Sequence, residues 1–354
     1  MRTRLLLPIA VLAALLLGLL TSVLQTAVAA PGADGEPVGR GEIQAEIAAK
    51  EQRVSAFLRA EKLSGLLLTR PANIAWMTAG LFDPPADGPN GTSRVCLLLV
   101  RDGGKLVIGP LSDMRRLTDE DLAGLGYEIR PQPWFEDAPV AVATDLLGRG
   151  AAGADAPIEG TRLVERGIAR LRYALTDSEV RKMRWVGRAA AEAVEEAGRR
   201  IQPQMSEIDV EIALSDALLR HGVRPTALSV AVDERVALHP HPPSTRARLK
   251  KLMRLVVRAK RWGLEVSLTR LVHVGVAPPD LERRVRALAL VNAQIQEATR
   301  PLVATPLLMQ RLLGWLAEGG LGAAWEQTPQ GGAIGYTVYD WLLRPSLDET
   351  IALS

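Results

Sequence analysis

The sequence predicts an α/β domain followed by a larger α+β domain, with the boundary near residues 145–165. The first half runs from a helix through short apolar runs and a hairpin to a second helix, which is an α/β order. The second half groups its helices in pairs around strand-like runs, an order typical of α+β domains. Residues 148–160, dense in Gly and Ala, separate the two, so the domains are assigned to residues 42–165 and 166–354.

The first domain is predicted to open with a helix over residues 42–62, because Ile43, Ile47 and Val54 recur at helical spacing. The turn Asp102-Gly103-Gly104 between two apolar runs predicts a hairpin. Apolar runs and periodicity give the remaining elements: strands at 63–69, 73–78 and 127–130, the hairpin over 94–110, and a helix over 112–125.

The second domain is predicted to begin with two capped helices. Thr176 and Glu179 have the spacing of a capping box, and the residues from Ser206 to Asp209 start a second helix. The elements that follow are strands at 226–232, 252–260 and 264–273, helices at 280–300 and 305–317, and a glycine-rich loop at 330–336.

Composition places the chain among soluble globular proteins. Of its 354 residues, 47% are hydrophobic, enough for sizeable cores, and the net charge is only +3. No basic stripe with interleaved aromatic residues is present, so nucleic acid is not an expected partner. The single cysteine, Cys96, allows no intramolecular disulfide and is predicted to be a buried thiol.

The N-terminus predicts export. Arg2 and Arg4 precede an apolar run over residues 5–20, and Ala27-Val28-Ala29 follows. This pattern is typical of a signal peptide, assigned to residues 1–30, with a flexible leader over 31–41. The protein is therefore expected in the periplasm or outside the cell. An uncleaved membrane anchor is the alternative, since the stretch is long enough to span a bilayer, and only then is a membrane partner expected.

Four segments together resemble the M24 superfamily of creatinase, aminopeptidase P and Xaa-Pro peptidases. They read LLLTRPANIAWMTAG, ALTDSEVRKMRWVGRAAAEAV, VVRAKRWGLEVSLTRLVHVG and QGGAIGYTVYDWL, in this order along the chain. The resemblance implies an α+β pita-bread C-terminal domain behind a smaller α/β creatinase-type N-terminal domain. It covers most of residues 43–354 and implies peptide substrates.

The same resemblance implies a centre of two divalent metals held by two Asp, one His and two Glu, and here the chain departs from it. The two Asp positions hold Val256 and Ser267, and the His position holds Pro329. The chain ends at Ser354, before the strands expected to carry the two Glu. Valine and proline offer no ligand atom, so no metal cofactor is expected. Missing late strands would expose a sheet edge and favour a homodimer.

Other side chains are candidates for the remaining chemistry. His239 and His241 lie in a Pro-rich loop, where the resemblance to creatinase implies an acid/base histidine, best matched by His241. The alternatives for this pair are a plain surface loop and non-catalytic binding. Gly331, Gly332 and His273 are the candidates for substrate binding. Glu265 shares a strand face with Ser267, while Glu326 and Asp340 flank the glycine-rich loop; solvated charges are the plainer interpretation of all three.

The family resemblance, together with these departures from it, leaves three possible functions. The first is an exported Xaa-Pro aminopeptidase-like protein that lacks the dimetal centre and has little or no peptidase activity. The second is a metal-independent, creatinase-like C–N hydrolase that uses His241. The third is a non-enzymatic peptide-binding protein. The expected partner in each case is a peptide or a small molecule.

Overall fold

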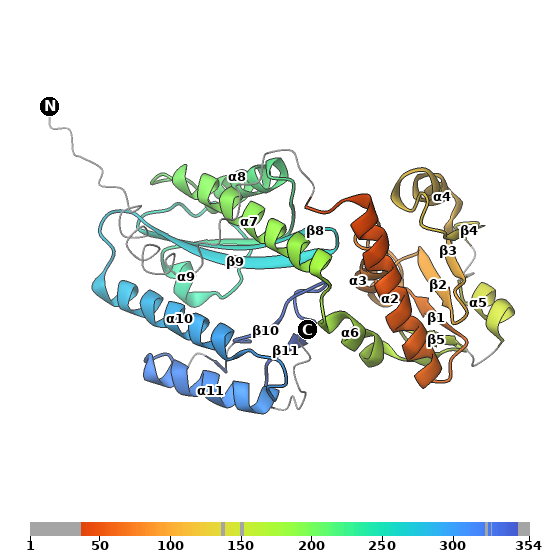
Figure 1. The fold of residues 1–354 in the computed structure, drawn as a ribbon. Helices are drawn as coiled ribbons and strands as arrows, with labels where there is room; N and C mark the ends of the chain where they lie inside the picture. Colours follow the sequence, from red (N-terminus) through yellow and green to blue (C-terminus); the bar gives the residue numbers. More distant parts are fainter. Residues whose placement is uncertain (1–36, 136–138, 149–151, 323–324, 327, 346–354) are drawn as a thin grey trace. The chain divides into compact units, whose positions relative to one another are not determined.

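Six strands make up the first sheet, in the order β4-β3-β2-β1-β5-β6 (Figure 1). The computed structural model describes residues 37–135, 139–148, 152–322, 325–326 and 328–345. The strands are β1 (Gly65–Leu68), β2 (Cys96–Val100), β3 (Lys105–Pro110), β4 (Glu128–Gln132), β5 (Ala152–Ala154) and β6 (Arg162–Leu163). β2 pairs antiparallel with β1 and β3, which confirms the predicted hairpin, and Cys96 is buried within it.

Helices surround this sheet. They are α2 (Arg40–Ala60), α3 (Pro71–Met77), α4 (Leu111–Arg116) with a π-helical turn behind it (Leu117–Asp121), α5 (Pro139–Leu147) and α6 (Glu165–Tyr173), with a short 3-10 turn (Pro89–Gly91) before β2. The predicted leader overlaps the described residues only from residue 37 onward, and the predicted signal at residues 1–30 lies outside them. Among the residues that the structure describes, no helix has the length and apolarity that a membrane crossing requires.

The strand predicted at residues 73–78 is wrong, because this segment belongs to helix α3. Pro71 stands at the first helical position, where its missing N–H costs nothing. All five residues from Asn73 to Met77 are buried, so the segment shows no polar face that would reveal a helical period. A short apolar run cannot be assigned to strand or helix by periodicity alone.

The second half of the chain begins with the two capped helices that the sequence predicts. In α7 (Asp177–Arg199) the Glu179 amide donates to the Thr176 hydroxyl over 3.2 Å, and the Glu179 carboxylate accepts from the Thr176 amide. Ser206 and Asp209 form the same reciprocal bonds at the start of α8 (Glu207–Arg220). These bonds satisfy amides that the first helical turn leaves without partners.

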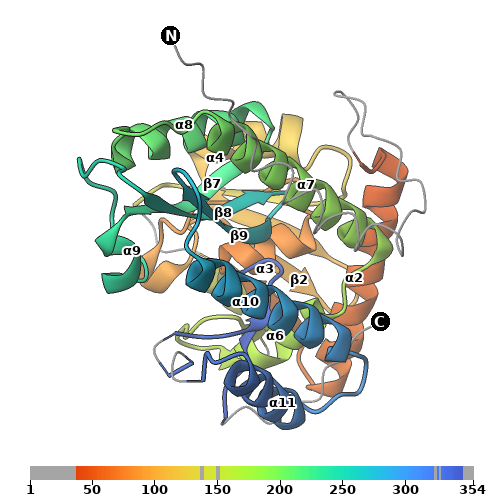
Figure 2. The same cartoon turned by 90° about the vertical axis from the view of Figure 1, so that its left-hand side faces the viewer.

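Helices α7 and α8 cover one face of a three-stranded antiparallel sheet (Figure 2). The sheet contains β7 (Arg224–Val232), β8 (Leu252–Arg261) and β9 (Leu264–His273), and the short helix α9 (Glu234–Leu238) follows β7. The side chains between helices and sheet are fully buried; among them are Val186, Leu214, Val230, Leu255 and Val257. This apolar layer fixes which residues of the strands face away from the helices.

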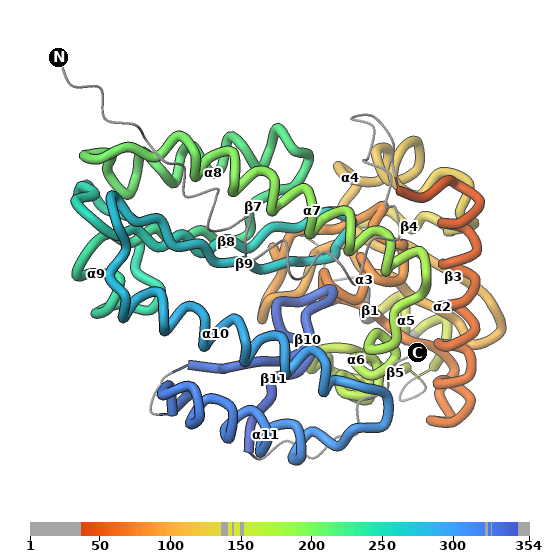
Figure 3. The backbone as a smooth tube through the Cα atoms, turned by 60° about the vertical axis from the view of Figure 1, so that its left-hand side comes forward, coloured from red at the N-terminus to blue at the C-terminus, as the bar shows by residue number. Residues whose placement is uncertain are grey.

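A second helix pair lies on the other side of these strands from α7 and α8 (Figures 1 and 3). It consists of α10 (Pro279–Ala298) and α11 (Thr305–Glu318), which pack together through Val291, Leu308 and Leu312. Val291 is the single buried residue of α10. A small hairpin of β10 (Gly332–Ala333) and β11 (Trp341–Leu342) follows.

Residues from Val38 onward pack as one unit, and a buried group of charges joins its distant segments. The group contains two lysines and two glutamates, Lys50, Lys182, Glu46 and Glu179, whose side chains are at most 1% exposed. Lys50 Nζ lies 2.5 Å from a Glu46 oxygen and 2.8 Å from a Glu179 oxygen, and Lys182 Nζ lies 2.9 Å from Glu46. Equal numbers of both charges make the group neutral.

Tyr336 completes this group from the far end of the chain. Its hydroxyl donates to Glu179 over 2.7 Å and accepts from Lys50 Nζ over 3.1 Å. Burial, first of all, raises the pKa of the Tyr336 hydroxyl, so it remains a donor. Lys50 and Lys182 also donate to the Trp76 and Ala79 carbonyls, each over 2.8 Å, so α2, α3, α7 and the glycine-rich loop share one hydrogen-bond network.

Candidate functional site

The candidate site is the face of β8 and β9 that points away from α7 and α8. Along β8 the side chains alternate: Met253, Leu255, Val257 and Ala259 are buried, while the residues between them are partly exposed. We call the second set and its partners on β9 the open face, defined as Arg254, Val256, Arg258, Lys260, Glu265, Ser267, Thr269, Leu271 and His273. Residues directly opposite in an antiparallel pair project to the same side of a sheet.

The two positions at which the family resemblance implies aspartate, Val256 and Ser267, both belong to this open face. Val256 stands directly opposite Thr269, and Ser267 directly opposite Arg258. Ser267 and Thr269 are exposed. The structure therefore brings the two positions together on adjacent strands, with an apolar side chain and a hydroxyl in place of carboxylates.

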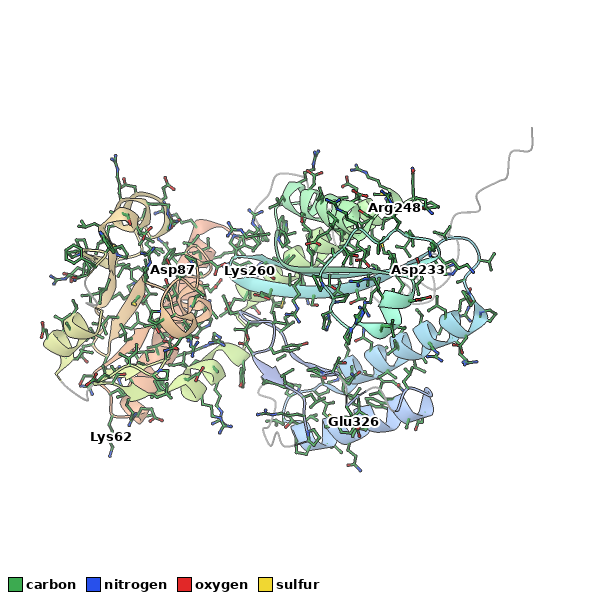
Figure 4. All side chains as sticks on the ribbon, turned by 180° about the vertical axis from the view of Figure 1, so that it is seen from behind. Lys62, Asp87, Asp233, Arg248, Lys260 and Glu326 are labelled. Carbon is green, nitrogen blue, oxygen red and sulfur yellow. The ribbon has the colours of Figure 1, made fainter. Side chains whose placement is uncertain are left out.

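Cationic side chains dominate the β8 half of the open face. Arg254 donates to three backbone carbonyls, those of Val236, His239 and Pro240, over 2.6–3.0 Å. Arg258 lies with its guanidinium 6.0 Å from the centre of the Tyr339 ring. Figure 4 labels Lys260 near the turn end of β8 and Asp233 near the other end. Lys260 is neutralised by Asp83, whose carboxylate lies 2.8 Å from Nζ.

Glu265 is the carboxyl group of the open face. One of its oxygens is buried and has no hydrogen-bond partner among the described residues. Burial raises the pKa of Glu265 above its usual value, even though Lys260 and Arg258 act in the opposite direction. Its backbone amide donates to the Gly335 carbonyl over 2.8 Å, which holds the glycine-rich loop against the start of β9.

The histidine loop is fixed by its backbone, while its rings remain exposed. Glu207, whose side chain is fully buried, accepts from the amide and hydroxyl of Thr245 and from Arg235. Ser229 donates to the Pro242 carbonyl over 2.8 Å. His239 and His241 themselves are exposed, and no described residue orients either ring through a hydrogen bond.

His273 lies at the far end of the open face, opposite Leu252. Its Nδ1 is 3.4 Å from the Gly275 carbonyl oxygen, a contact within its own turn. This position separates it along β9 from Ser267 by six residues, or about 20 Å at strand spacing. The structure thus places His273 on the same face as Ser267 but apart from it.

The glycine-rich loop forms part of the small hairpin. A Cβ added to Gly332 would lie 2.4 Å from the Trp341 carbonyl oxygen, so the glycine permits close approach of β11. Gly331 has room for a side chain, its nearest neighbour being Leu343 at 3.8 Å. Pro329, the position at which the resemblance implies a ligand histidine, is exposed and precedes both.

Gly332→Ala is expected to lower the melting temperature by several degrees, because the added methyl group must displace backbone rather than a flexible side chain. Gly331→Ala is the matched control, and we expect no comparable loss from it. Thermal unfolding followed by circular dichroism measures both. Equal melting temperatures for the two variants would contradict the packing role assigned to Gly332.

The residues of the open face do not fit a dimetal centre. Divalent metals in such sites are held by clustered carboxylate and imidazole ligands. Within the part of the chain that the structure describes, no group of three or more His, Cys, Asp or Glu side chains could hold a metal ion. Glu265 is the nearest acidic candidate, but its closest charged neighbours across the strands are cationic.

A cavity of about 760 Å³ lies elsewhere, where α6 meets β11. Its walls include Phe57, Arg162, Arg166, Tyr173, Trp341 and Arg344. Of the residues that the sequence analysis considers, Asp340 lines it, and its carboxylate is paired with Arg172. Arg162, at its rim, is paired with Glu61 over 2.7 Å.

The sequence pattern points to Glu265 as a residue of the site, but it does not point to Arg258. The available signal is its spacing, since Arg258 is two residues from Val256 and so projects to the same side of β8. Its contact with Tyr339 depends on how the distant hairpin packs, which no local pattern reveals.

Comparison with known proteins relates part of the chain to one family. The sequence profile of Metallopeptidase family M24 matches residues 181–338. No curated protein sequence gives a significant match. Among solved structures, the dipeptidase PepE from Mycobacterium ulcerans is 17% identical with a TM-score of 0.71, covering 87% of this chain and 86% of its own.

Two further structures share the fold. The Xaa-Pro dipeptidase from Bacillus anthracis is 17% identical with a TM-score of 0.68, covering 86% of this chain and 87% of its own. The N-terminal domain of FACT complex subunit SPT16 from chickpea, Cicer arietinum, is 11% identical with a TM-score of 0.63, covering 86% of each chain. The predicted α+β pita-bread fold with a smaller α/β N-terminal domain is confirmed, and residues 181–338 match the model of Metallopeptidase family M24.

Proposed function

We propose that this protein is an exported, peptidase-like member of the M24 superfamily that binds a peptide or a small molecule on its open face without a dimetal centre. On this proposal it has little or no metallopeptidase activity. The observation that carries it is the pairing of Ser267 with Arg258 and of Val256 with Thr269. Neither pair supplies a carboxylate, and one places a permanent cation beside the position of an implied metal ligand.

Electrostatics supports this absence of metal. A divalent cation in a protein needs anionic or neutral oxygen and nitrogen ligands to replace its water. Two guanidinium groups, those of Arg254 and Arg258, flank Val256 at two residues on either side of it along β8. Their positive charge would repel the ion that the fold family uses, so we expect the open face to exclude it.

Two relatives support a peptide-like ligand. The matched structures from Mycobacterium ulcerans and Bacillus anthracis are named as dipeptidases. The structure from chickpea, which has the same fold, is named as a subunit of a complex rather than as a peptidase. A ligand-binding protein without peptidase chemistry is therefore compatible with the fold.

The metal content of the purified protein tests the proposal. The protein is dialysed against Mn²⁺ or Zn²⁺, desalted and analysed by mass spectrometry, and hydrolysis of Xaa-Pro dipeptides is assayed in parallel. We expect neither stoichiometric metal nor cleavage. The Xaa-Pro dipeptidase from Bacillus anthracis is the positive control for the peptide assay. Two tightly bound ions per chain, or metal-dependent cleavage, would refute the proposal.

The acid/base role of His241 stays a prediction. A proton-transfer residue works best when a neighbour fixes its ring, and no described residue hydrogen-bonds to this imidazole. If a metal-independent C–N hydrolase activity is found, His241→Ala tests this role, with His239→Ala as the neighbouring control. Activity that survives His241→Ala would exclude it.

Export is tested separately by N-terminal sequencing of the secreted protein. A mature chain that begins after Ala29 or Ala30 is expected. A chain that keeps Met1 and sediments with membranes would favour the anchor instead.

A further inference from the structure

The open face carries polar groups whose hydrogen-bonding capacity is not filled. Arg254 Nε and one carboxyl oxygen of Glu265 are buried and have no partner among the described residues. The two groups come from neighbouring strands and project to the same side of the sheet. The two residues stand at opposite ends of the strand pair, because Glu265 is opposite Lys260, six residues from Arg254. Buried polar groups are nearly always paired, so each of these two atoms can accommodate a hydrogen-bond partner of its own.

Two arginines of the open face, Arg254 and Arg258, form no ion pair with a described carboxylate. The three hydrogen bonds that Arg254 donates from its terminal nitrogens go to neutral backbone carbonyls. Arg258 is partly buried, and no described carboxylate or carbonyl hydrogen-bonds to it. Lys260, by contrast, is neutralised by Asp83. A partly buried guanidinium without an anion is unfavourable, so this pair of charges calls for a negative ligand.

Glu265 is only a partial counter-charge for these two arginines. It stands opposite Lys260 and diagonally across from Arg258. Its raised pKa means that it keeps its proton to a higher pH than an exposed glutamate does. The described carboxylates around it, Asp83 and Asp340, are already paired, with Lys260 and Arg172 respectively.

Hydroxyl groups lie beside the two arginines. Ser267 is directly opposite Arg258, and Thr269 is directly opposite Val256, between the two guanidinium positions. Both are exposed, and neither hydroxyl has a hydrogen-bond partner among the described residues. Hydroxyl donors next to a guanidinium suit an oxyanion, since they can bond to oxygens that the guanidinium fork does not reach.

We infer that the open face binds a small oxyanion, the carboxylate or phosphate group of its ligand, through Arg258 with Ser267 and Thr269. The site thus has the opposite charge preference from a dimetal centre, because it presents cations to an anion. Arg258 provides the permanent charge, while the two hydroxyls select an oxygen-rich group. This inference rests on the proposed function, since it places the ligand on the same metal-free face.

Calorimetric titration in the presence of EDTA tests the inference. The full-length protein is titrated with N-acetyl-Ala-Pro bearing a free carboxylate, with the same dipeptide amide, and with inorganic phosphate. Binding of the free acid but not of the amide identifies a carboxylate ligand. Binding of phosphate alone identifies a phosphate ligand. If none of the probes binds at millimolar concentration, the inference is overturned.

Variants assign the binding to the open face. Arg258→Gln is expected to weaken anion binding by about tenfold or more, as the loss of a charge-assisted hydrogen bond predicts. Ser267→Asp should abolish binding, because it places a carboxylate directly opposite Arg258. Arg115→Gln is the control, since it removes the same charge from an arginine that is 93% exposed on α4. Thermal unfolding checks that each variant is folded.

The outcomes separate this inference from the proposed function. Anion binding that is unchanged by both Arg258→Gln and Ser267→Asp would overturn the inference, whatever the metal content. Stoichiometric metal in the EDTA-free protein would refute the proposed function, whatever the titrations show. Weakening in both variants, with Arg115→Gln unchanged, supports the anion site.

Discussion

Replacing Lys50 with methionine is expected to lower the free energy of unfolding by about 3–5 kcal/mol. Lys50 Nζ makes two ion pairs, with Glu46 and Glu179, and hydrogen bonds to the Trp76 carbonyl and the Tyr336 hydroxyl. Methionine matches its length but leaves the two carboxylates with Lys182 alone. One negative charge would then remain buried without compensation, which is the costly way to break an ion pair.

Urea unfolding followed by circular dichroism measures this loss. Lys250→Met is the control, because this lysine side chain is exposed and only its backbone amide is bonded. The double variant Lys50→Met/Glu179→Gln removes one charge of each sign and should recover part of the stability. A loss below about 1 kcal/mol for Lys50→Met, in the range of a surface pair, would contradict the role of the buried network.

Glu207→Ala is expected to be the next most damaging change, with a loss of about 2–4 kcal/mol for a buried carboxylate with several charge-assisted hydrogen bonds. Its oxygens accept from the Val232 amide, from Arg235 and from both donors of Thr245 over 2.6–2.9 Å. These bonds tie α8 to the end of β7 and to the histidine loop, so the variant should also loosen that loop.

The contribution of Glu207 should depend on pH. Burial alone would raise its pKa, but the bonds from Thr245, Val232 and Arg235 outweigh burial and lower the pKa below its usual value. A lowered folded-state pKa gives stability that is complete above the unfolded-state pKa of about 4.3 and is lost as pH falls through the folded-state value. The difference in the free energy of unfolding between wild type and Glu207→Gln should therefore become smaller below about pH 4.

Unfolding free energies at pH 7, 4 and 3 check this dependence. Glu234→Gln is the matched control, since that glutamate is exposed and belongs to the neighbouring helix α9. If the difference in unfolding free energy between wild type and Glu207→Gln stayed constant or grew on acidification, the ionised carboxylate would not be the group that stabilises the histidine loop.

Local signals predicted most of the fold because each acts within one helical turn or one strand pair. The capping residues Thr176 and Ser206 begin α7 and α8 as expected, since a cap depends on amides three residues away. The Asp102-Gly103-Gly104 turn closed the predicted hairpin for the same reason. The sequence does not distinguish α3 from a strand, because burial on all sides of this segment removes the periodic signal of a helix.

The buried charge network could not be predicted from single helices. Lys50 does lie in the apolar stripe of α2, three residues after Ile47 and four before Val54, and this placement marks it as an inward-facing lysine. Its partners, however, come from α7 and from Tyr336, and only the packed structure brings them together. The open face is partly predictable, since the family resemblance points to Val256 and Ser267. The lack of an ion pair at Arg258 depends on its tertiary neighbours and is not predictable in this way.

The bond between Lys50 and Tyr336 has a consequence for folding during synthesis. The two residues are 286 positions apart in the sequence. The bond therefore joins α2, the first described helix, to one of the last described segments of the chain. Until Tyr336 packs, Lys50 has only three of its four partners, Glu46, Glu179 and the Trp76 carbonyl, and Glu179 lacks the hydroxyl that donates to it. Closing so long a loop is slow, as for all contacts of high sequence separation. The bond that completes the buried charge group therefore forms only when nearly the whole chain is available.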